Sequence, residues 1–493
     1  MCWIYRLWSH FWRNPGWRAK NSLRDWRSFL ICRIRLRGKC ARICSVNERQ
    51  NLRRLAGPVM KTAPKKKSRA DLRRERREAL ISAGLHIVSR SGYANASVSR
   101  VTDEAGLSQG TLYSYFDNHQ AFLDELLEVE GYRFFRFLDR HTVRSDSFFE
   151  TERSSFMAYS RYVKRHRYFP RVLTDAESAA PTSYANHMDR VEARYLKALM
   201  RGEAAGELRP QSEAALRVIA EVLAGSYGHM SIGAQVRPYG KVGRDAVFPD
   251  WVADTYIRFI RSGLGETVSA LPVPTVARGV DSPAHTTREV LLEAAARVVW
   301  RTGFDGATIK AIVDEAGLAV GTFYSHFESQ QEIFDELLAY IRVKMLAHVR
   351  SFIDGKARFV DREYAGFVGF FDYLRDHPWY IRIESAAAVY ATDTYRKHFL
   401  DLTDSYVRTL NRAKQNGELG QFEEHELPVL AHMFMATRHY IAARYLPPTS
   451  ENRTLPGHVF DTYRQFIESG LAVSRTASDP VEAVSSFRSV PLS

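Results

Sequence analysis

The sequence has little cysteine and no long apolar run. All four cysteines lie near the amino terminus, at Cys2, Cys32, Cys40 and Cys44, and the rest of the chain has none. They show no tight spacing of metal ligands, and a chain body without cysteine is typical of a reducing compartment. No stretch approaches the roughly 18 apolar residues that a membrane-spanning helix requires, which excludes an integral membrane protein.

Signals for β-strands and for catalysis are also missing. Beyond residue 120 the apolar residues recur at helical spacing, interrupted by prolines such as Pro170, Pro181 and Pro210. We find no phosphate-binding glycine loop, no dinucleotide-binding fingerprint, no nucleophile elbow and no metal-binding histidine pair. Isolated pairs such as Arg438-His439 are interpreted as packing or surface residues. We therefore expect an all-α protein that is not an enzyme and that needs neither a cofactor nor a metal.

Basic residues are concentrated at the amino terminus. Residues 1–60 carry 14 Lys and Arg against Asp25 and Glu48, a net +12 of the chain's +14. Residues 61–77 add nine basic and two acidic residues, and everything after them has 47 basic against 52 acidic residues. The isoelectric point near 9.5 is thus a property of the amino-terminal segment rather than of the folded body.

Residues 1–60 admit three explanations. A basic segment that holds five of the eight tryptophans is compatible with an arm that binds nucleic acid or a membrane surface. Its many arginines and few acids also fit a transit peptide. We favour the third explanation, an over-extended start with the true start at Met60, because the sequence after Met60 resembles the short basic lead-in to a DNA-binding domain.

One motif is written twice, 211 positions apart. Residues 106–116 read GLSQGTLYSYF, and residues 317–327 read GLAVGTFYSHF. Aligned without a gap, 79–127 and 290–338 share 21 of 49 residues. The register continues, because Gly-Glu-Leu at 206–208 recurs 211 positions later and Phe-Ile-x-Ser-Gly-Leu at 259–264 recurs 207 positions later. We interpret the chain as a duplication of a whole subunit, giving copy 1 and copy 2, each of about 200 residues and large enough for its own core.

This period predicts the domain organisation. Each copy would have a small helix-turn-helix domain, called a head, followed by a larger helical domain, called a body. The segment between the copies is rich in proline and is predicted to be a linker. The expected ranges are 1–60 (extension), 61–77 (basic arm), 78–125 (head 1), 126–264 (body 1), 265–285 (linker), 286–336 (head 2), 337–475 (body 2) and 476–493 (disordered tail).

Within each head the local signals agree with two short helices joined by a tight turn. Gly92 and Gly303 follow the first helix, where a residue with positive φ normally closes it. Ser97 and Thr308 are suitable N-caps for the next helix. Gly106 and Gly317 supply the glycine-containing turn of a helix-turn-helix, after which a short helix is expected to run to Phe116 or Phe327.

In such a motif the second helix enters the major groove of DNA, with its first residues at the base edges. Gly110 and Gly321 would let this helix approach the duplex closely, while Thr111, Thr322, Tyr113 and Tyr324 offer hydroxyls for phosphate or base. The predicted DNA contacts are Ser97, Arg100, Ser108, Gln109, Gly110, Thr111, Tyr113, Tyr115 and His119 in head 1, and Thr308, Lys310, Val320, Gly321, Thr322, Tyr324 and His326 in head 2.

With these residues in place, both copies resemble the TetR/AcrR family of bacterial transcriptional regulators. The resemblance rests on GLSQGTLYSYF followed by FLDELL, and it covers nearly all of residues 70–264 and 283–471. It implies an all-helical fold, a ligand pocket and dimerisation face in each body, a cytoplasmic, nucleoid-associated protein, and a repressor released from DNA by a small molecule. It also implies that 213–236, 251–264, 426–446 and 458–471 form a four-helix interface between the bodies.

The two heads depart from the family pattern and from each other. The family commonly has lysine three positions after the motif's phenylalanine, where this chain has His119 and Gln330. Ala319 replaces Ser108, which predicts the loss of a cap bond of about 1 kcal/mol in head 2. Gln109 can hydrogen-bond adenine, whereas Val320 offers only apolar contact. Arg100 with Ala311, and Ser99 with Lys310, differ as well. We expect an operator with two dissimilar half-sites about one helical turn apart.

Joining two subunits makes their pairing intramolecular. A flexible linker of 21 residues would reach about 25 Å, at an effective concentration on the order of millimolar. The chain is then expected to bind double-stranded DNA as a single-chain pseudo-dimer. The alternative is a homodimer in which copy 1 pairs with copy 1 of another chain.

The bodies carry weaker signals. Aromatic residues at helical spacing are candidates for an apolar effector pocket, although for any one of them we favour ordinary core packing as the explanation. The candidates are Phe156, Tyr159, Tyr162, Phe367, Phe370, Phe371 and Trp379. The alternative function is a ligand-binding or scaffold protein with weakened heads. Because both heads keep Gly, Thr and Tyr in register, we favour the regulator.

Overall fold

The computed structural model describes residues 68–241, 246–269, 286–447 and 453–473. It divides into one unit of residues 1–72, of which only the start of the first helix is described, and a second unit of residues 73–493 that contains all the other described residues. Within the described residues every regular element is a helix, and the only β-pairing is an isolated bridge between Leu208 and Ala472. The expected all-α fold is confirmed.

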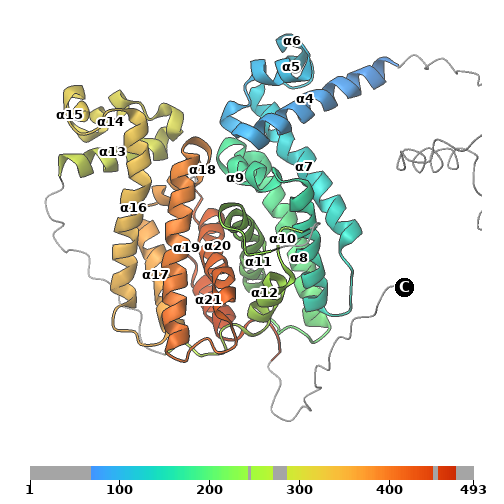
Figure 1. The fold of residues 1–493 in the computed structure, drawn as a ribbon, viewed down its shortest axis with the longest axis vertical. Helices are drawn as coiled ribbons and strands as arrows, with labels where there is room; N and C mark the ends of the chain where they lie inside the picture. The colour runs from blue at the N-terminus through green and yellow to red at the C-terminus, as the bar shows by residue number, and fades with distance from the viewer. Residues whose placement is uncertain (1–67, 242–245, 270–285, 448–452, 474–493) are drawn as a thin grey trace, which may run out of the picture. The chain divides into compact units, whose positions relative to one another are not determined.

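The helices repeat in the same order in the two copies (Figure 1). Copy 1 contains α4 (Arg69–Ser91), α5 (Val98–Ala105), α6 (Gln109–Tyr113), α7 (His119–His141), α8 (Phe148–Arg165), α9 (Phe169–Ala179), α10 (Pro181–Ala204), α11 (Glu213–Val236) and α12 (Asp250–Ser262). Copy 2 contains α13 (Thr287–Gly306), α14 (Ile309–Ala316), α15 (Val320–Tyr324), α16 (Gln330–Ile353), α17 (Phe359–Asp376), α18 (Trp379–Tyr390), α19 (Thr392–Gln415), α20 (Leu427–Tyr445) and α21 (Gly457–Ser469).

The heads form as their caps and turns predict. Ser97 accepts a hydrogen bond from the Arg100 backbone N–H at 3.5 Å, and Thr308 accepts one from the Ala311 N–H at 3.2 Å. Gly106 and Gly317 adopt the left-handed conformation, with φ of 66° and 67°. This conformation is strained for a residue with a Cβ. It ends the first motif helix, α5 or α14, so that the chain can turn into the second motif helix, α6 or α15.

Two expected helix boundaries were wrong. The second motif helices end at Tyr113 and Tyr324 and do not reach the phenylalanines at 116 and 327. The first helix of copy 1 begins at Arg69, inside the predicted basic arm, because the arginines and glutamates of that stretch are good helix formers.

The core of head 1 is separate from the core of the rest of the chain. Tyr93 is 2% exposed and packs with Leu80, Val101 and Phe122, and α9 closes this cluster with Val172 and its neighbours. In head 2 the equivalent residues, including Phe304, belong to one continuous core that extends through both bodies. Head 2 is thus packed onto its body more extensively than head 1.

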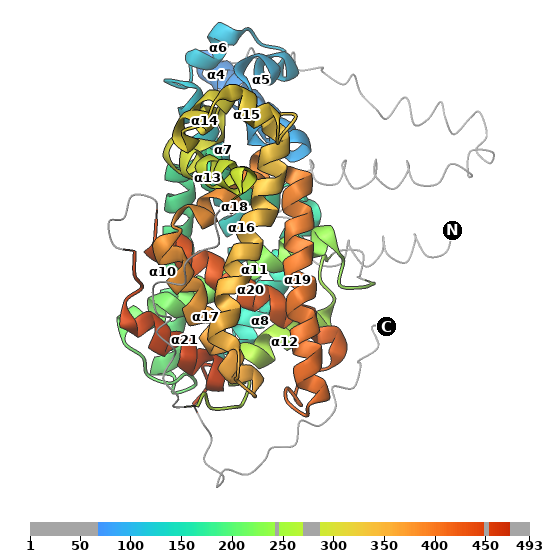
Figure 2. The same ribbon diagram turned by 90° about the vertical axis from the view of Figure 1, so that its left-hand side faces the viewer.

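The two bodies meet through α11 and α12 of copy 1 and α20 and α21 of copy 2, and α11 and α20 lie side by side (Figures 1 and 2). After α12 and α21 the backbones exchange hydrogen bonds reciprocally. Leu264 donates to the Ile467 carbonyl at 2.7 Å, and Leu471, 207 positions later, donates to the Ile260 carbonyl at 2.8 Å. Such an exchange marks an isologous interface with a local two-fold relation.

Two glycines permit this close approach. Gly263 and Gly470 both have positive φ, of 60° and 63°. A Cβ at Gly263 would lie 2.6 Å from the Ile467 carbonyl oxygen, and one at Gly470 would lie 2.4 Å from the backbone carbonyl carbon of Arg261. Neither position therefore tolerates a side chain, which explains why the Ser-Gly-Leu of 262–264 recurs at 469–471.

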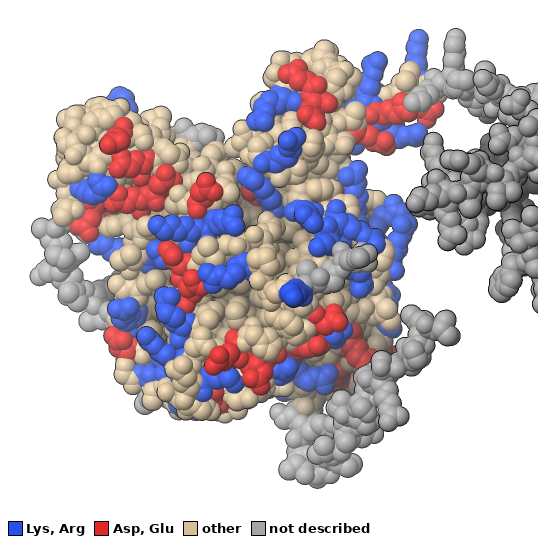
Figure 3. Space-filling view, in the orientation of Figure 1, with Lys and Arg blue, Asp and Glu red and all other residues tan. Residues whose placement is uncertain are grey.

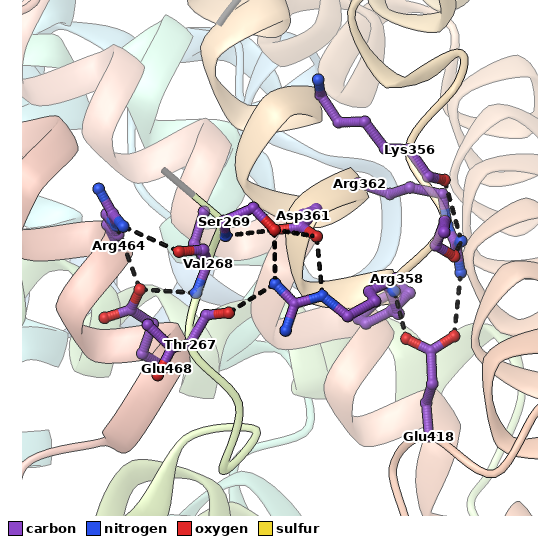
Figure 4. Close-up of polar contacts among 12 residues, drawn as sticks. Thr267, Val268, Ser269, Lys356, Arg358, Asp361, Arg362, Glu418, Arg464 and Glu468 are labelled. Atoms are coloured by element: carbon purple, nitrogen blue, oxygen red, sulfur yellow. Dashed lines mark hydrogen bonds and ion pairs between the residues drawn. The ribbon is translucent and has the colours of Figure 1, made fainter. Parts of the chain in front are cut away.

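The first residues of the predicted linker are held against copy 2 (Figure 4). Ser269 donates its backbone N–H to Asp361 at 2.6 Å, and Arg358 donates to the Thr267 carbonyl at 2.7 Å. Val268 donates to Glu468 and accepts from Arg464. Residues 267–269 are therefore held against copy 2 and are not part of a free coil. The remainder of the linker lies outside the described residues.

Candidate nucleic-acid interface and ligand cavities

The start of the second motif helix is open to solvent in both heads. Tyr113 is 54% exposed and Tyr324 58% exposed, and Val320 is also an exposed apolar side chain. A Cβ built on Gly110 or Gly321 would meet no atom within 4 Å. Packing within the chain therefore does not require glycine at either position.

The predicted cap at Ser108 is absent. Ser108 has the extended backbone of an N-cap residue but makes no cap hydrogen bond; its hydroxyl instead contacts the Thr111 hydroxyl at 2.9 Å. Ala319 has nearly the same φ and ψ in head 2. The expected loss of a cap bond through Ala319 was therefore wrong, and in head 2 Ala319 offers no hydroxyl to Thr322.

The two charged residues predicted to contact DNA from the first motif helix are exposed, and each makes one exposed side-chain contact. Arg100 donates to the Asn95 side chain at 2.8 Å, and Lys310 pairs with Asp314 one turn later at 2.6 Å. Exposed pairs of this kind contribute little to stability, so both cations can exchange these partners for an external phosphate.

His119 and Gln330 hold the heads together internally. The His119 ring Nε2 lies 2.7 Å from the Ala96 carbonyl, and the Gln330 amide donates to the Ala307 carbonyl at 3.0 Å. The two carbonyls are 211 positions apart, so each residue links the start of the long helix to the end of the turn before the motif. At the place of the family's lysine, this chain has a residue that binds its own backbone.

Tyr115 and His326 are half-buried. The Arg73 guanidinium lies 5.7 Å from the Tyr115 ring centre, a cation–π contact. The carbonyl of His326 accepts a hydrogen bond from Arg288. Both positions therefore lie between the open face and the core of the head.

Copy 1 contains a cavity of about 260 Å³ between α7, α8, α9, α10 and α11. At its inner end lies Glu152, which is buried and accepts hydrogen bonds from the hydroxyls of Tyr195 at 3.1 Å, Tyr227 at 2.8 Å and Tyr256 at 2.7 Å. Burial raises the pKa of the Glu152 carboxyl, although the three hydroxyls act in the opposite direction. No cation contacts this carboxyl among the described residues.

Copy 2 contains a cavity of about 180 Å³ in the corresponding place. Its buried carboxylate is Glu363, 211 positions after Glu152, and here Arg438 takes the place of Tyr227. Arg438 donates to Glu363 at 2.7 Å, and Tyr406 and Tyr463 also donate to that carboxylate. Burial opposes the charge on Arg438, but Glu363 outweighs burial and raises the arginine pKa. The same position therefore holds a carboxyl bound only by tyrosine hydroxyls in copy 1 and a carboxylate paired with an arginine in copy 2.

A second charged cluster borders the copy 2 cavity at the contact between the copies. His439 lies 3.1 Å from Glu177 of copy 1 and 3.7 Å from Glu384 of copy 2. Burial alone would lower the pKa of His439, but these two carboxylates raise it to about 10. His439 is therefore a buried cation that connects α20 to both α9 and α18. The equivalent position in copy 1 is Gly228.

Each cavity is completed by the opposite copy. Tyr440 of copy 2 lines the copy 1 cavity, and His229 of copy 1 lines the copy 2 cavity, and these two residues are 211 positions apart. A Cβ on Gly228 would lie 2.4 Å from the Tyr440 hydroxyl, so the small residue on α11 admits that ring. Each cavity is therefore lined by residues of both copies.

Two of the seven predicted pocket residues line a cavity. They are Tyr159 in copy 1 and Phe370 in copy 2. The structure places four of the others in the surrounding core and Trp379, which is partly buried, against that core; the four are Phe156, Tyr162, Phe367 and Phe371. The sequence prediction missed the two glutamates, although an acidic residue kept 211 positions apart within apolar helices was a usable signal.

The described residues contain no helix long and apolar enough to cross a membrane. In the same ranges no group of three or more His, Cys, Asp or Glu is arranged to hold a metal ion.

A family model described as "Bacterial regulatory proteins, tetR family" matches residues 80–126 and 291–337. The repressor KstR of Mycobacterium tuberculosis is 31% identical over 168 residues, which are 33% of this chain and 76% of KstR. The repressor KstR2 of the same species is 32% identical over 98 residues, or 20% of this chain and 49% of KstR2, so the chain spans about half the length of that relative.

Two solved structures also match part of the chain. The structure of the ketosteroid regulator KstR2 of Mycobacterium tuberculosis covers 40% of this chain and 100% of its own, with 23% identity and a TM-score of 0.30. The Bacillus subtilis regulator FadR, solved in complex with stearoyl-CoA, covers 37% of this chain and 96% of its own, with 16% identity and a TM-score of 0.31. From the match to KstR and the doubled family match, the chain belongs to the TetR family, with two subunits in tandem.

Proposed function

We propose that this chain is a DNA-binding transcriptional regulator, not an enzyme, in which one polypeptide supplies both halves of the reader. The observation that carries the proposal is the combination of two exposed heads with bodies that exchange hydrogen bonds reciprocally, at Leu264 with Ile467 and at Leu471 with Ile260. In a TetR-family dimer the corresponding interface would join two chains; here it would join two copies of one chain. The domain ranges predicted above give the limits of the two copies in this proposal. The protein would be cytoplasmic and associated with the nucleoid.

The two heads would read different sequences. Gln109 and Val320 occupy the same exposed position at the start of the second motif helix, and only Gln109 can form a bidentate bond to adenine. The predicted contacts of each head flank this position, with Tyr113 and Tyr324 suited to phosphate. The operator would then consist of two dissimilar half-sites about one helical turn apart.

A small molecule in the body cavities would release the heads from DNA. The relatives KstR and KstR2 are named repressors, which favours repression for this chain. A route from cavity to head is available through α9, whose Asp175 accepts the Tyr93 backbone N–H at 3.2 Å. In copy 2, Arg382 of α18 donates to the Trp300 carbonyl of α13. A ligand that displaces α9 or α18 would therefore act directly on a head.

Selection from random duplexes with the full chain tests this function. The expected result is a bound motif of two unlike half-sites. A strictly palindromic motif would contradict the assignment of different reading heads, and no enrichment at all would favour the ligand-binding or scaffold alternative.

A further inference from the structure

We propose that the two cavities take chemically different ligands. The copy 1 cavity would bind an amphipathic anion, with an apolar body and a carboxylate or phosphate head, and the copy 2 cavity would take an uncharged apolar molecule. The inference deepens the proposed function by assigning a ligand class to each cavity, but binding itself can be measured without DNA.

The copy 1 cavity has cations without partners. Arg144, Lys197 and Arg201 line it with exposed side chains, and within the described ranges none of them makes a side-chain hydrogen bond or an ion pair. The fourth lining cation, Arg194, is paired with Asp139 at 2.8 Å. Figure 3 shows Lys and Arg side chains gathering over the side of copy 1 where α7, α8 and α10 lie. Three positive charges at this cavity are therefore available to an anion.

The interior of the same cavity suits an apolar body. Its walls are formed largely by apolar side chains: Phe134, Phe135, Leu138, Phe169, Leu173, Met188 and Val191. Glu152, its one buried acid, is bound by three hydroxyls, and burial raises its pKa. Burial also lowers the pKa of the lining His187 to about 4, so that this ring is neutral at pH 7. The charged head of a ligand would find its partners among the exposed cations, because no cation among the described residues contacts Glu152 at the buried end.

In copy 2 every cation that lines the cavity already has a partner. Arg438 pairs with Glu363 at 2.7 Å, Arg362 with Glu418 at 3.5 Å, and His439 with Glu177 at 3.1 Å. The lining acid Glu384 lies near two histidines, at 3.5 Å from His398 and 3.7 Å from His439. A ligand charge placed here would have no free countercharge, and desolvating it would be unfavourable.

The difference arises at equivalent positions. Arg194 of copy 1 corresponds to Ser405, and Arg144 corresponds to Gly355. Lys197 and Arg201 correspond to Arg408 and Arg412, but these two arginines do not line the copy 2 cavity. The pair Arg408 and Arg412 therefore offers a matched control, with the same chemistry on the equivalent helix and no access to a cavity.

The test uses the full chain and calorimetric titration with octyl phosphate, octanoate and octanol. We expect both anions to bind at the copy 1 cavity and octanol to bind at the copy 2 cavity. The double change Lys197→Gln and Arg201→Gln should weaken both anions at least tenfold and octanol less than twofold, whereas Arg408→Gln with Arg412→Gln should change neither. Preference for one anion identifies a phosphate or a carboxylate head. Anion affinities left unchanged by Lys197→Gln with Arg201→Gln, octanol weakened by that change as much as the anions, or an equal loss in both double variants would overturn the proposal.

A second variant tests whether the ligand enters the cavity. Ala224→Met in copy 1 installs the residue that copy 2 carries at the equivalent position, Met435, and narrows the copy 1 cavity. We expect it to weaken octyl phosphate at least fivefold while leaving the cations intact. Unchanged affinity would show that the anion rests on the basic surface alone and would also overturn the assignment. Because no DNA is present, failure here is distinct from failure of the heads to bind an operator.

Discussion

The cavities of the two copies occupy equivalent positions but have almost no side chains in common. Among the positions that line both, only the pairs Glu152 with Glu363 and Tyr195 with Tyr406 are identical. The heads, by contrast, keep 21 of 49 residues between 79–127 and 290–338. The duplicated chain has thus retained its scaffold and its motif while the interior of each body has changed. The comparison therefore contrasts two similar heads with two cavities of different chemistry.

The largest expected effect comes from the buried carboxylates. Arg438→Met removes the cation beside Glu363, and we expect a loss of about 3 kcal/mol in unfolding free energy at pH 8. The loss should shrink towards pH 5, because the isolated carboxyl would take up a proton. Urea unfolding at the two pH values measures both effects.

Two controls sharpen that result. Tyr227→Phe at the equivalent position of copy 1 should cost only about 1 kcal/mol, because Glu152 keeps two other hydroxyls. Arg438→Tyr, which copies the arrangement of copy 1, should recover part of the loss. If Tyr227→Phe were as costly as Arg438→Met, the two carboxylate sites would not differ as the structure indicates.

The His439 cluster should make stability fall in alkali. Its folded pKa of about 10 lies above the ordinary value of 6.5, so its contribution is complete below pH 6.5 and is lost as the pH rises through about 10. We expect His439→Gln to lower the unfolding free energy by about 2 kcal/mol at pH 7, and by much less at pH 10.5. Denaturant titrations of both proteins give this difference.

His187→Gln is the matched control for the alkaline experiment. His187 is buried in copy 1, and burial lowers its pKa to about 4, so it carries no charge between pH 7 and pH 10.5. The difference between this variant and the natural chain should therefore stay constant over that range. A difference for His439→Gln that is equally flat would show that His439 is not a buried cation.

One substitution tests whether the two heads read different bases. Val320→Gln gives head 2 the same residue as head 1 at the start of the second motif helix. We expect the selected operator to become more symmetric, with discrimination at the affected base pair changing by about 1–3 kcal/mol. Quantitative band shifts on operators varied at one half-site measure it. A head 2 preference left unaltered by Val320→Gln would mean that this position does not read a base.

The smallest effect concerns the absent cap. Because Ser108 makes no cap hydrogen bond, Ser108→Ala should change thermal stability by less than about 0.5 kcal/mol. Ser97→Ala, which removes a bond that the structure does contain, should cost about 1 kcal/mol. Equal losses in the two variants would indicate that Ser108 caps its helix in solution.

The repeat and the turn residues were enough to predict much of the fold. Ser97 and Gly106 act locally, by capping a helix and closing a turn. The 211-residue period relates the two copies, so the helix order of one copy predicts that of the other. The length of the second motif helices was overestimated because the phenylalanines at 116 and 327 lie just beyond the last helical turn. Ser108 was misjudged because a competing hydroxyl at Thr111 takes the place of the backbone N–H.

The residues that line the cavities could not be predicted from the helical spacing of apolar residues. Phe156 and Tyr159 are both buried on α8, and only the packing of neighbouring helices decides that Tyr159 borders open space while Phe156 does not. The partners of Glu152 come from three other helices, at Tyr195, Tyr227 and Tyr256. Helical spacing identifies a buried face, but it does not say which part of that face meets a ligand.

The central claim is that one chain supplies both halves of the reader. The most direct measurement is the molar mass of the complex between the full chain and its selected operator, by light scattering on a sizing column. The account predicts one chain per duplex, and a free protein that is monomeric at the same concentration. A complex with two chains per duplex, formed from a dimer in which copy 1 pairs with copy 1, would contradict it.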